Sequence, residues 1–410
     1  MGTQPDISYH TLETGLRIVS RRLKASPVEI CGIAVNAGSR DEHPDEHGLA
    51  HLVEHTIFKG TGRRLARHIN TRMEAVGGEL NAYTTKEETF LYSVFPAGNL
   101  TRAVDLIADL ATDSRFPADE VEREREVVCD EIDSYLDTPS EAVFDDFEEL
   151  AFAGSPLAHN ILGTKESVMT LGGEDCRAFL ERYYTPGRMV FFYQGRAPHT
   201  RVVETAERYF GLLTRPDTPV DRTAPAPAVR FDISRDIASH QAHTVIGART
   251  PGLLSPRRHA LDIVTNVLGG PGMNSLLNVA LREKRGLVYS VDASTSMMTD
   301  SGLMTIYIGC DPGDTARCRR LTAGILGRLT REGLSPARLA AAKKQLLGQL
   351  TVASTGFENT ALSMARATLH RGQAMTPPEV ARAITDVTAA DIIETARMIA
   401  PENMSVLTLM

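Results

Sequence analysis

The alternation of apolar and polar residues predicts strands and helices in both halves of this 410-residue chain. Four runs rich in β-branched or aromatic residues predict strands, at 16–35, 90–95, 242–248 and 303–308. Helix-like runs follow in GLAHLVEHTIFKG, which ends at Gly60, and in RRHALDIVTNVLGG, which ends at Gly270. Further helices are expected to begin at Pro117 and Pro336, because proline suits the first helical turn.

The same elements recur in the same order, which indicates a diverged repeat. The two helix ends are 210 residues apart and the two proline starts are 219 apart, a drift of the size that loop insertions produce. The second copy lacks the acidic positions of the first, because Lys343 and Leu350 stand where Glu124 and Glu131 would recur. One copy is therefore expected to be active and the other degenerate.

A proline-rich segment at 215–230, RPDTPVDRTAPAPAVR, predicts an extended linker that cuts the chain almost in half. We therefore expect one domain at 1–214 and a second at 231–410. The predicted fold class is α+β, with two structurally similar domains that each have a mainly antiparallel sheet with helices packed on it.

Composition narrows the classes of function. The formal net charge of −8 argues against nucleic acid as a partner, since phosphate binding needs a basic face. No apolar run is long enough to span a membrane, and the first ten residues lack the features of a signal peptide, so a cytoplasmic location is expected. The five widely spaced cysteines include no C-x-x-C pair, which favours buried, reduced thiols.

The chemistry of the chain is concentrated in GLAHLVEHTIFKGT. His51 and His55 are four residues apart and therefore share one helical face, and Glu54 lies on the same side. Two such imidazoles are half of a zinc site, and a neighbouring carboxylate can take a proton from a water that zinc has acidified. A surface helix with two solvated histidines would show the same spacing.

His43 and His47 continue this four-residue spacing upstream. Pro44 and Gly48 interrupt the run, so we expect both histidines to lie in a loop before the helix.

Zinc in hydrolases commonly takes three protein ligands, so a third must come from another segment. The acidic helix VEREREVVCDEIDSYL offers Glu124 and Glu131, seven residues apart on one face. Position alone does not choose between them, and it does not exclude Glu122, Glu126 or Asp130.

The stretch GSRDEHPDEHGLAHLVEHTIFKGT resembles the signature of the pitrilysin and insulin-degrading-enzyme superfamily, the inverzincins. Chain length and the two-domain layout resemble the branch that contains mitochondrial processing peptidase and its bacterial relatives. The resemblance implies zinc as cofactor, His51 and His55 as ligands, and Glu54 as the catalytic base. It also implies Glu131 as the third ligand, 76 positions beyond the second histidine, and a role for Glu124 in orienting a ligand.

Two further segments carry the resemblance. LGGPGMNSLLNVALREKRGLVYSVDAS is similar to a family segment with an arginine and a tyrosine seven residues apart, here Arg282 and Tyr289. The family role implies a tyrosine donor to the oxyanion and an arginine on a substrate carbonyl, although a packing tyrosine and a surface cation would fit the residue types alone. GGELNAYTTKEETFLYS resembles the substrate-binding edge strand, which pairs with an extended peptide. The residues expected there are Asn81, Ala82, Tyr83 and Thr84.

The resemblance implies a zinc metalloendopeptidase that cleaves short or unfolded peptides in a closed chamber, by attack of a zinc-bound water. A homodimer is expected, in which Arg282 and Tyr289 act on the zinc site of the partner subunit. The main alternative is a non-catalytic scaffold or partner subunit of the same fold, and a metal hydrolase for a non-peptide substrate is a third. Between Asp109 and Glu149, 16 acidic residues against 3 arginines either favour basic peptides or form a solvated helix face.

Overall fold

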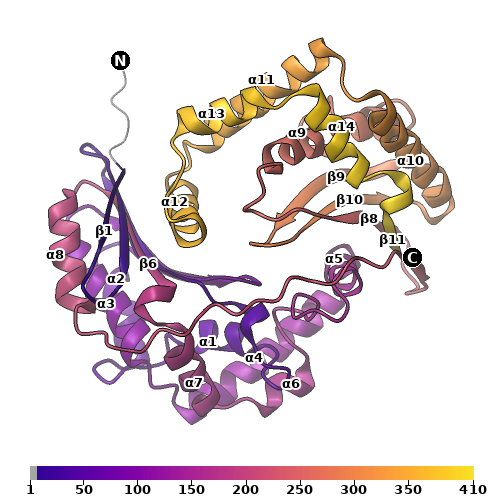
Figure 1. Cartoon of the computed structure of the whole chain (residues 1–410). Coiled ribbons are helices and arrows are strands. Elements are labelled where there is room, and N and C mark those ends of the chain that lie inside the picture. The colour runs from indigo at the N-terminus through magenta and orange to yellow at the C-terminus, as the bar shows by residue number, and fades with distance from the viewer. Residues whose placement is uncertain (1–6) are drawn as a thin grey trace. The chain divides into compact units, whose positions relative to one another are not determined.

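The computed structural model describes residues 7–410, so the N-terminal residues 1–6 of the stretch searched for a signal peptide lie outside the described part. The chain forms two compact units, each a sheet with helices packed on it, which confirms the predicted α+β class (Figure 1). Unit 1 contains residues 7–132 together with 159–222 and 354–374. Unit 2 contains 133–158, 223–353 and 375–410.

The sheet of unit 1 has six strands. Their order is β1 (Ile7–Thr11), β2 (Arg17–Arg22), β6 (Met189–Gly195), β3 (Val28–Val35), β5 (Thr89–Pro96) and β4 (Glu79–Thr84). Every neighbouring pair is antiparallel except β2 and β6. Since β4 pairs with β5 alone among the described strands, its other edge is free of main-chain partners.

The sheet of unit 2 repeats this arrangement without a counterpart of β1. Its order is β7 (Asp232–Arg235), β11 (Ser405–Leu409), β8 (Ala242–Thr250), β10 (Gly302–Cys310) and β9 (Val288–Met297). The one parallel pair, β7 with β11, takes the position of β2 with β6. The free edge strand β9 takes the position of β4, so the two sheets have the relation that a diverged repeat predicts.

The helices of unit 1 are α1 (Leu49–Thr56), α2 (Ala66–Glu74), α3 (Leu100–Asp113), α4 (Ala118–Leu136, which continues into unit 2), α6 (Lys165–Thr170), α7 (Gly173–Tyr183), α8 (His199–Phe210) and α12 (Phe357–Arg371). Those of unit 2 are α5 (Pro139–Ala151), α9 (Arg258–Gly269), α10 (Thr315–Glu332), α11 (Pro336–Ala353), α13 (Pro377–Asp386) and α14 (Ala389–Met398). Short 3₁₀ segments lie at Ser39–Asp41, Pro186–Arg188, Pro312–Asp314 and Pro401–Asn403, and a π-helical segment, η3, at Asn278–Glu283. None of the helices in 7–410 has the length and apolar character that a membrane span needs.

Most predicted elements form where the pattern places them, with two differences. The extended stretch 16–35 is two strands with a turn between them, and the helix expected to end at Gly60 already ends at Thr56. The chain leaves α1 early because it turns to form isolated bridges, from Gly60 to Leu65 and from Thr61 to Ser114. All five cysteines are free thiols, and all but Cys129 are buried.

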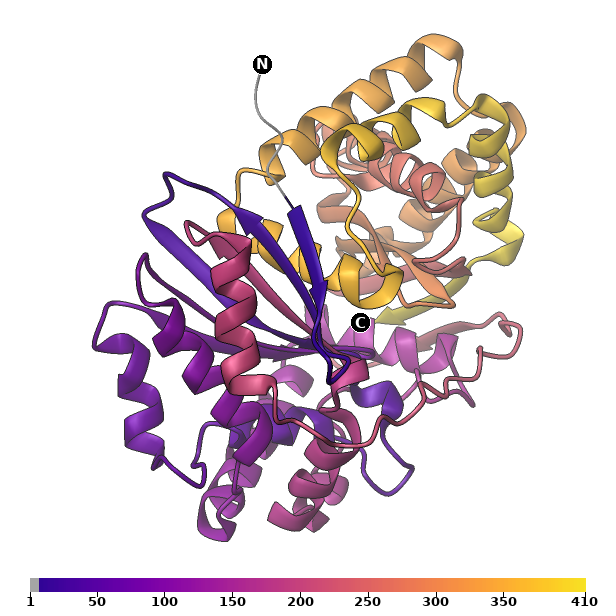
Figure 2. The same cartoon turned by 60° about the vertical axis from the view of Figure 1, so that its left-hand side comes forward.

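In each unit, one helix follows directly along the chain on a helix of the other unit. α5 follows the long helix α4 but packs in unit 2, where Phe147 joins a cluster with Val245 and Leu407. α12 follows the long helix α11 but packs in unit 1, with Ala361 and Met364 buried against the sheet. Figures 1 and 2 show α12 and α8 on opposite faces of the unit 1 strands. The chain crosses from unit 1 to unit 2 after Arg222, inside the proline-rich segment 215–230.

Polar contacts fasten α12 to the sheet of unit 1. Arg17 donates to the carbonyls of Thr368 and Leu369 at 3.0 and 3.2 Å, and Tyr92 donates to Glu358 at 2.6 Å.

The most buried of these contacts belongs to Glu88, whose residue is 3% exposed. Its carboxylate is 2.9 Å from Nε2 of His370 and is ion-paired with Arg366, and both partners lie on α12. Burial alone would raise the pKa of Glu88, but its two partners lower it to below the ordinary glutamate range.

We predict that Glu88→Gln lowers the free energy of unfolding at pH 7 by about 2 kcal/mol, because a buried charge-assisted contact is lost. The folded-state pKa is the lower one, so the carboxylate stabilises the fold above the unfolded-state pKa of about 4.3. That contribution disappears as the pH falls through the folded-state value. Denaturant unfolding at pH 7 and pH 3 measures the difference. Glu204→Gln on the exposed face of α8 is the control and should change neither value. An equal loss at both pH values would contradict the ionic account.

Candidate functional site

The start of α1 is fixed by a glycine and a buried carboxylate. Gly48 has φ 93°, and a Cβ there would lie 2.7 Å from the carbonyl oxygen of Leu162, so both conformation and space require glycine. The carboxylate of Glu42 accepts from the backbone N–H groups of Gly48 at 3.0 Å and Ala50 at 2.7 Å. Acceptor oxygens at a helix N-terminus satisfy N–H donors that have no partner within the helix.

Glu42 also meets a residue from a distant segment. Nε2 of His159 lies 2.9 Å from its carboxylate, and the imidazole of His159 stacks on that of His47 with ring centroids 3.8 Å apart. Burial raises the pKa of Glu42 well above its ordinary value and lowers that of His159 to about 4. His43 and His47 lie before α1, as predicted, and His47 belongs to this support of the helix.

Beyond this support, three ligand-type side chains form a cluster in which His51 is buried and the other two residues are half-buried. His51 and His55 on α1 meet Glu131 on α4, with one ligand-type atom from each within 4.8 Å of the other two. Oε2 of Glu131 is 3.7 Å from Nε2 of His51 and 3.5 Å from Nε2 of His55. Among His, Cys, Asp and Glu side chains of residues 7–410, this is the one group of three or more that converges in this way.

Glu124 sets the orientation of the second histidine. Its carboxylate is 3.2 Å from Nδ1 of His55, which leaves Nε2 directed to Glu131, and its other oxygen is 2.6 Å from Nζ of Lys59. A carboxylate on the outer nitrogen of a histidine is the usual partner of a metal-binding imidazole. The two candidate glutamates therefore differ in position: Glu131 faces both histidines, and Glu124 lies behind one of them.

The donor set fits a divalent metal such as zinc. Burial, and to a smaller extent His55, lowers the pKa of His51 to about 3, so this imidazole is neutral at physiological pH and has a free lone pair. Nδ1 of His51 is buried without a hydrogen-bond partner among the described residues. Two imidazole nitrogens and one carboxylate oxygen are a ligand set of catalytic zinc, which also needs an open position.

Glu54 lies beside the cluster, on the same helix. Burial raises its pKa above the ordinary glutamate range, against the opposing effect of the polar groups of Thr84 on β4. A carboxylate with a raised pKa next to a metal position is suited to take a proton from water and to give it back.

The edge strand β4 runs past this helix. Leu80 and Ala82 pack toward the core that contains α1, whereas Tyr83 packs on the opposite face and stacks on Phe90 with centroids 4.8 Å apart. The predicted strand from Asn81 to Thr84 thus lies in β4, is partly exposed along its length, and has a free main-chain edge.

Arg282 and Tyr289 belong to unit 2, whereas the site residues described so far belong to unit 1. Arg282 is exposed in η3, and Tyr289 is the second residue of the edge strand β9, with 61% of its surface exposed. The hydroxyl of Tyr289 donates to Asp311 at 2.9 Å, which raises the pKa of the phenol. Both side chains are thus on the surface of unit 2.

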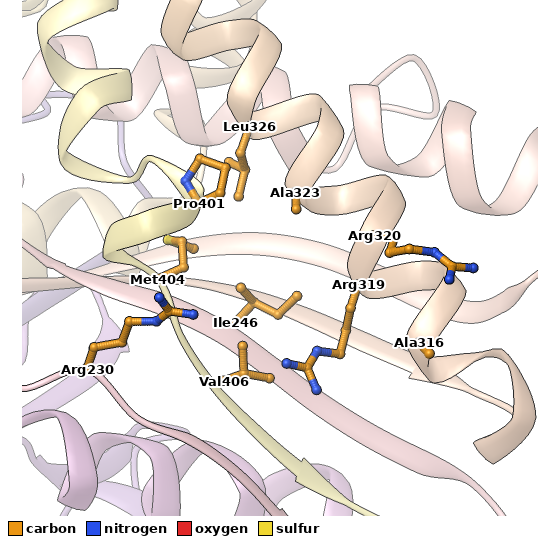
Figure 3. Close-up of a pocket in the computed structure, with 10 residues that line it drawn as sticks. All are labelled: Arg230, Ile246, Ala316, Arg319, Arg320, Ala323, Leu326, Pro401, Met404 and Val406. Atoms are coloured by element: carbon orange, nitrogen blue, oxygen red, sulfur yellow. The ribbon is translucent and has the colours of Figure 1, made fainter.

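A pocket of about 350 Å³ in unit 2 contains none of the predicted site residues. Its floor includes Ile246, Met404 and Val406, and Figure 3 shows Arg230 and Arg319 reaching over this floor. Arg319 is ion-paired with Asp232, so part of the positive charge of the pocket is already balanced.

The contact of Glu42 with His159, which supports the start of α1, was not predicted from the sequence. His159 is 117 residues from Glu42, so no local spacing connects them. A glutamate six residues before the helix-starting glycine was visible in the sequence, but the usual N-terminal cap lies immediately before a helix.

Comparison with known proteins agrees with the geometry. Residues 17–165 match the family described as Insulinase (Peptidase family M16), and residues 170–346 match the one described as Peptidase M16 inactive domain. An uncharacterized zinc protease of Mycobacterium tuberculosis is 36% identical over 394 residues, covering 94% of this chain and 89% of that protein. The uncharacterized zinc protease YmxG of Bacillus subtilis is 31% identical, covering 88% of this chain and 87% of that protein.

Solved structures show the same fold. A protease from Helicobacter pylori superposes with a TM-score of 0.91 at 20% identity, over 99% of this chain and all of that one. A structure from Pseudomonas fluorescens, described as a peptidase M16 inactive domain, has a TM-score of 0.92 at 17% identity, over 98% and 97% of the two chains. On the sequence matches and the shared two-unit fold, this chain belongs to peptidase family M16, the insulinase family.

Proposed function

We propose that this protein is a zinc-dependent endopeptidase that cleaves short or unfolded polypeptides. The observation that supports this most directly is the convergence of His51, His55 and Glu131 beside the carboxylate of Glu54 and the free edge of β4. Relatives that match nearly the whole chain are named zinc proteases.

In this proposal His51, His55 and Glu131 hold the zinc ion. When bound, zinc supplies a Lewis acid and an acidified water molecule. Glu124 keeps the second histidine in the tautomer that leaves Nε2 free, and Lys59 balances the charge of Glu124. The buried Glu42 keeps the start of α1 in place, and so fixes the separation of the two histidines from the acidic helix α4.

Glu54 is the proton carrier. It takes a proton from the attacking water and passes it to the leaving amine, for which a raised pKa is an advantage. An extended peptide adds to the free edge of β4 through main-chain hydrogen bonds, from Asn81 to Thr84. Main-chain pairing needs an unfolded segment and little sequence identity, which is why we propose unstructured peptides as the substrates.

Arg282 and Tyr289 complete the site in our proposal, from the second copy of a homodimer. Support comes from the resemblance of their segment to related peptidases and from the exposure of both side chains on unit 2. A phenol donates a hydrogen bond to the developing oxyanion, and a guanidinium holds a carbonyl of the peptide.

We predict that Glu54→Gln retains zinc but lowers kcat by about 100-fold to 10,000-fold, because the proton carrier is lost while the ligands remain. His51→Ala should lose the metal as well as activity. Metal analysis and cleavage of a fluorogenic peptide library, with and without a chelator, measure both quantities. Glu204→Gln is the control and should match the wild type. Stoichiometric zinc with no hydrolysis of any unstructured peptide would contradict the proposal and favour a non-catalytic partner subunit.

We also predict that Glu54→Gln and Tyr289→Phe chains, each nearly inactive alone, recover activity when mixed. Random mixing of a symmetric dimer gives one intact site in half of the dimers, or about a quarter of wild-type activity. Native mass spectrometry of the mixture establishes whether mixed dimers form. Mixed dimers without recovered activity would rule out action between subunits, and an absence of any dimer would rule out the homodimer.

A further inference from the structure

A peptide strand bound along the free edge of β4 would contact both faces of the unit 1 sheet. On one of these faces lies a cavity. A peptide strand paired with β4 directs alternate side chains to opposite faces of the sheet. One face is that of α1 and Glu54. The other is the face on which Tyr83 packs and which α12 covers.

Four side chains form a stripe along α12. Asn359, Leu362, Ser363 and Arg366 are spaced by three and four residues, so they lie on one side of the helix. The residues that α12 buries against the sheet, Ala361, Met364 and Ala365 among them, occupy a different side. With Tyr83 of β4, the stripe lines a cavity of about 320 Å³ within unit 1.

The lining of this cavity is rich in donors. Arg366 is ion-paired with Glu88, yet 47% of its side chain is exposed, and a guanidinium has five N–H groups. The amide of Asn359 and the hydroxyl of Ser363 are also exposed.

No carboxylate is among the described residues that line the cavity. The acidic neighbours on this side are occupied, because Glu88 is bound by His370 as well as Arg366, and Glu358 accepts from Tyr92 at 2.6 Å. The side chain of Leu362 and the ring of Tyr83 give the cavity an apolar wall.

We propose that this cavity is a specificity subsite for a glutamate or glutamine side chain of the bound peptide. The acceptor oxygens of such a side chain reach the donors of Arg366, Ser363 and Asn359, while its methylene groups lie against Leu362 and Tyr83. A lysine or arginine in the same position would face Arg366 and is disfavoured.

This inference rests on the proposed pairing of a peptide with β4. It implies that the sequence preference recurs at every second residue of the bound peptide. Side chains that face α12 are two residues apart in the peptide, and their neighbours face α1. A change in the stripe therefore alters the preference at one peptide position, or at positions two apart, and leaves the intervening positions unchanged.

The test uses a peptide library in which one position at a time is varied. The full-length protein and its Ser363→Glu, Ser363→Ala and Arg366→Gln variants are compared by cleavage-site profiling. Ser363→Glu places a carboxylate in the cavity, at an exposed helical position that accommodates it. We expect Ser363→Glu to shift the preference from glutamate to lysine or arginine by about fivefold, the effect of one exposed ion pair.

Arg366→Gln should weaken the preference for glutamate and leave that for glutamine nearly unchanged, and Ser363→Ala should change little. Arg338→Gln, an exposed arginine of α11 in unit 2, is the matched control and should leave the profile as it is. A Ser363→Glu profile identical to that of the wild type, or one changed equally at adjacent positions, would overturn the subsite.

Binding of the same peptides to Glu54→Gln chains, measured by fluorescence anisotropy, separates this proposal from the proposed function. Binding with a glutamate preference but no hydrolysis by the wild type would support the subsite and overturn the peptidase. Hydrolysis by the wild type, together with binding that does not discriminate glutamate from lysine, would support the peptidase and overturn the subsite.

Discussion

The buried carboxylate of Glu42 at the start of α1 is the contact on which the candidate centre depends. α1 has only eight residues, and so short a helix has little stability of its own. Glu42 satisfies two of its free N–H groups and is itself held by His159. Because His51 and His55 follow within two turns, the start of the helix sets where both imidazoles point.

The second helix of the centre, α4, contributes two glutamates with different surroundings. Glu131 faces both imidazoles, and Glu124 lies behind His55 next to Lys59. Because they are seven residues apart, both carboxylates lie on one side of α4. They are two turns apart along the helix, so that Glu131 faces the cluster and Glu124 contacts the outer nitrogen of His55. The same residue type thus fits two roles, and the difference comes from position alone.

In the repeated fold, the candidate metal ligands lie in one half of the chain, and the described residues of the other half contain no comparable group. The five strands that the two sheets share have the same order and the same single parallel pair, and among the described strands each sheet ends in a free edge strand. Beside β4 lie Glu54 and the histidines, whereas β9 carries the exposed Tyr289 near its start. The exchange of α5 and α12 adds a further difference, because the face of the β4 sheet opposite α1 is covered by a helix from the C-terminal half.

The sequence by itself determined the element types, the repeat and the α+β class, since these depend on local periodicity and on spacing along the chain. It also placed His51, His55 and Glu54 on one side of a helix, because a four-residue separation is one turn wherever the helix lies. The residues alone did not choose between Glu124 and Glu131, and only resemblance to a family did so before the structure showed which one faces the histidines. Tertiary structure alone decided the contact of Glu42 with His159, the early end of α1, and the position of α12 beside Tyr83. The contact of Glu42 with His159 and the position of α12 join segments from about 100 to nearly 300 residues apart, where contact is decided by packing and burial, and no local pattern in the sequence records it.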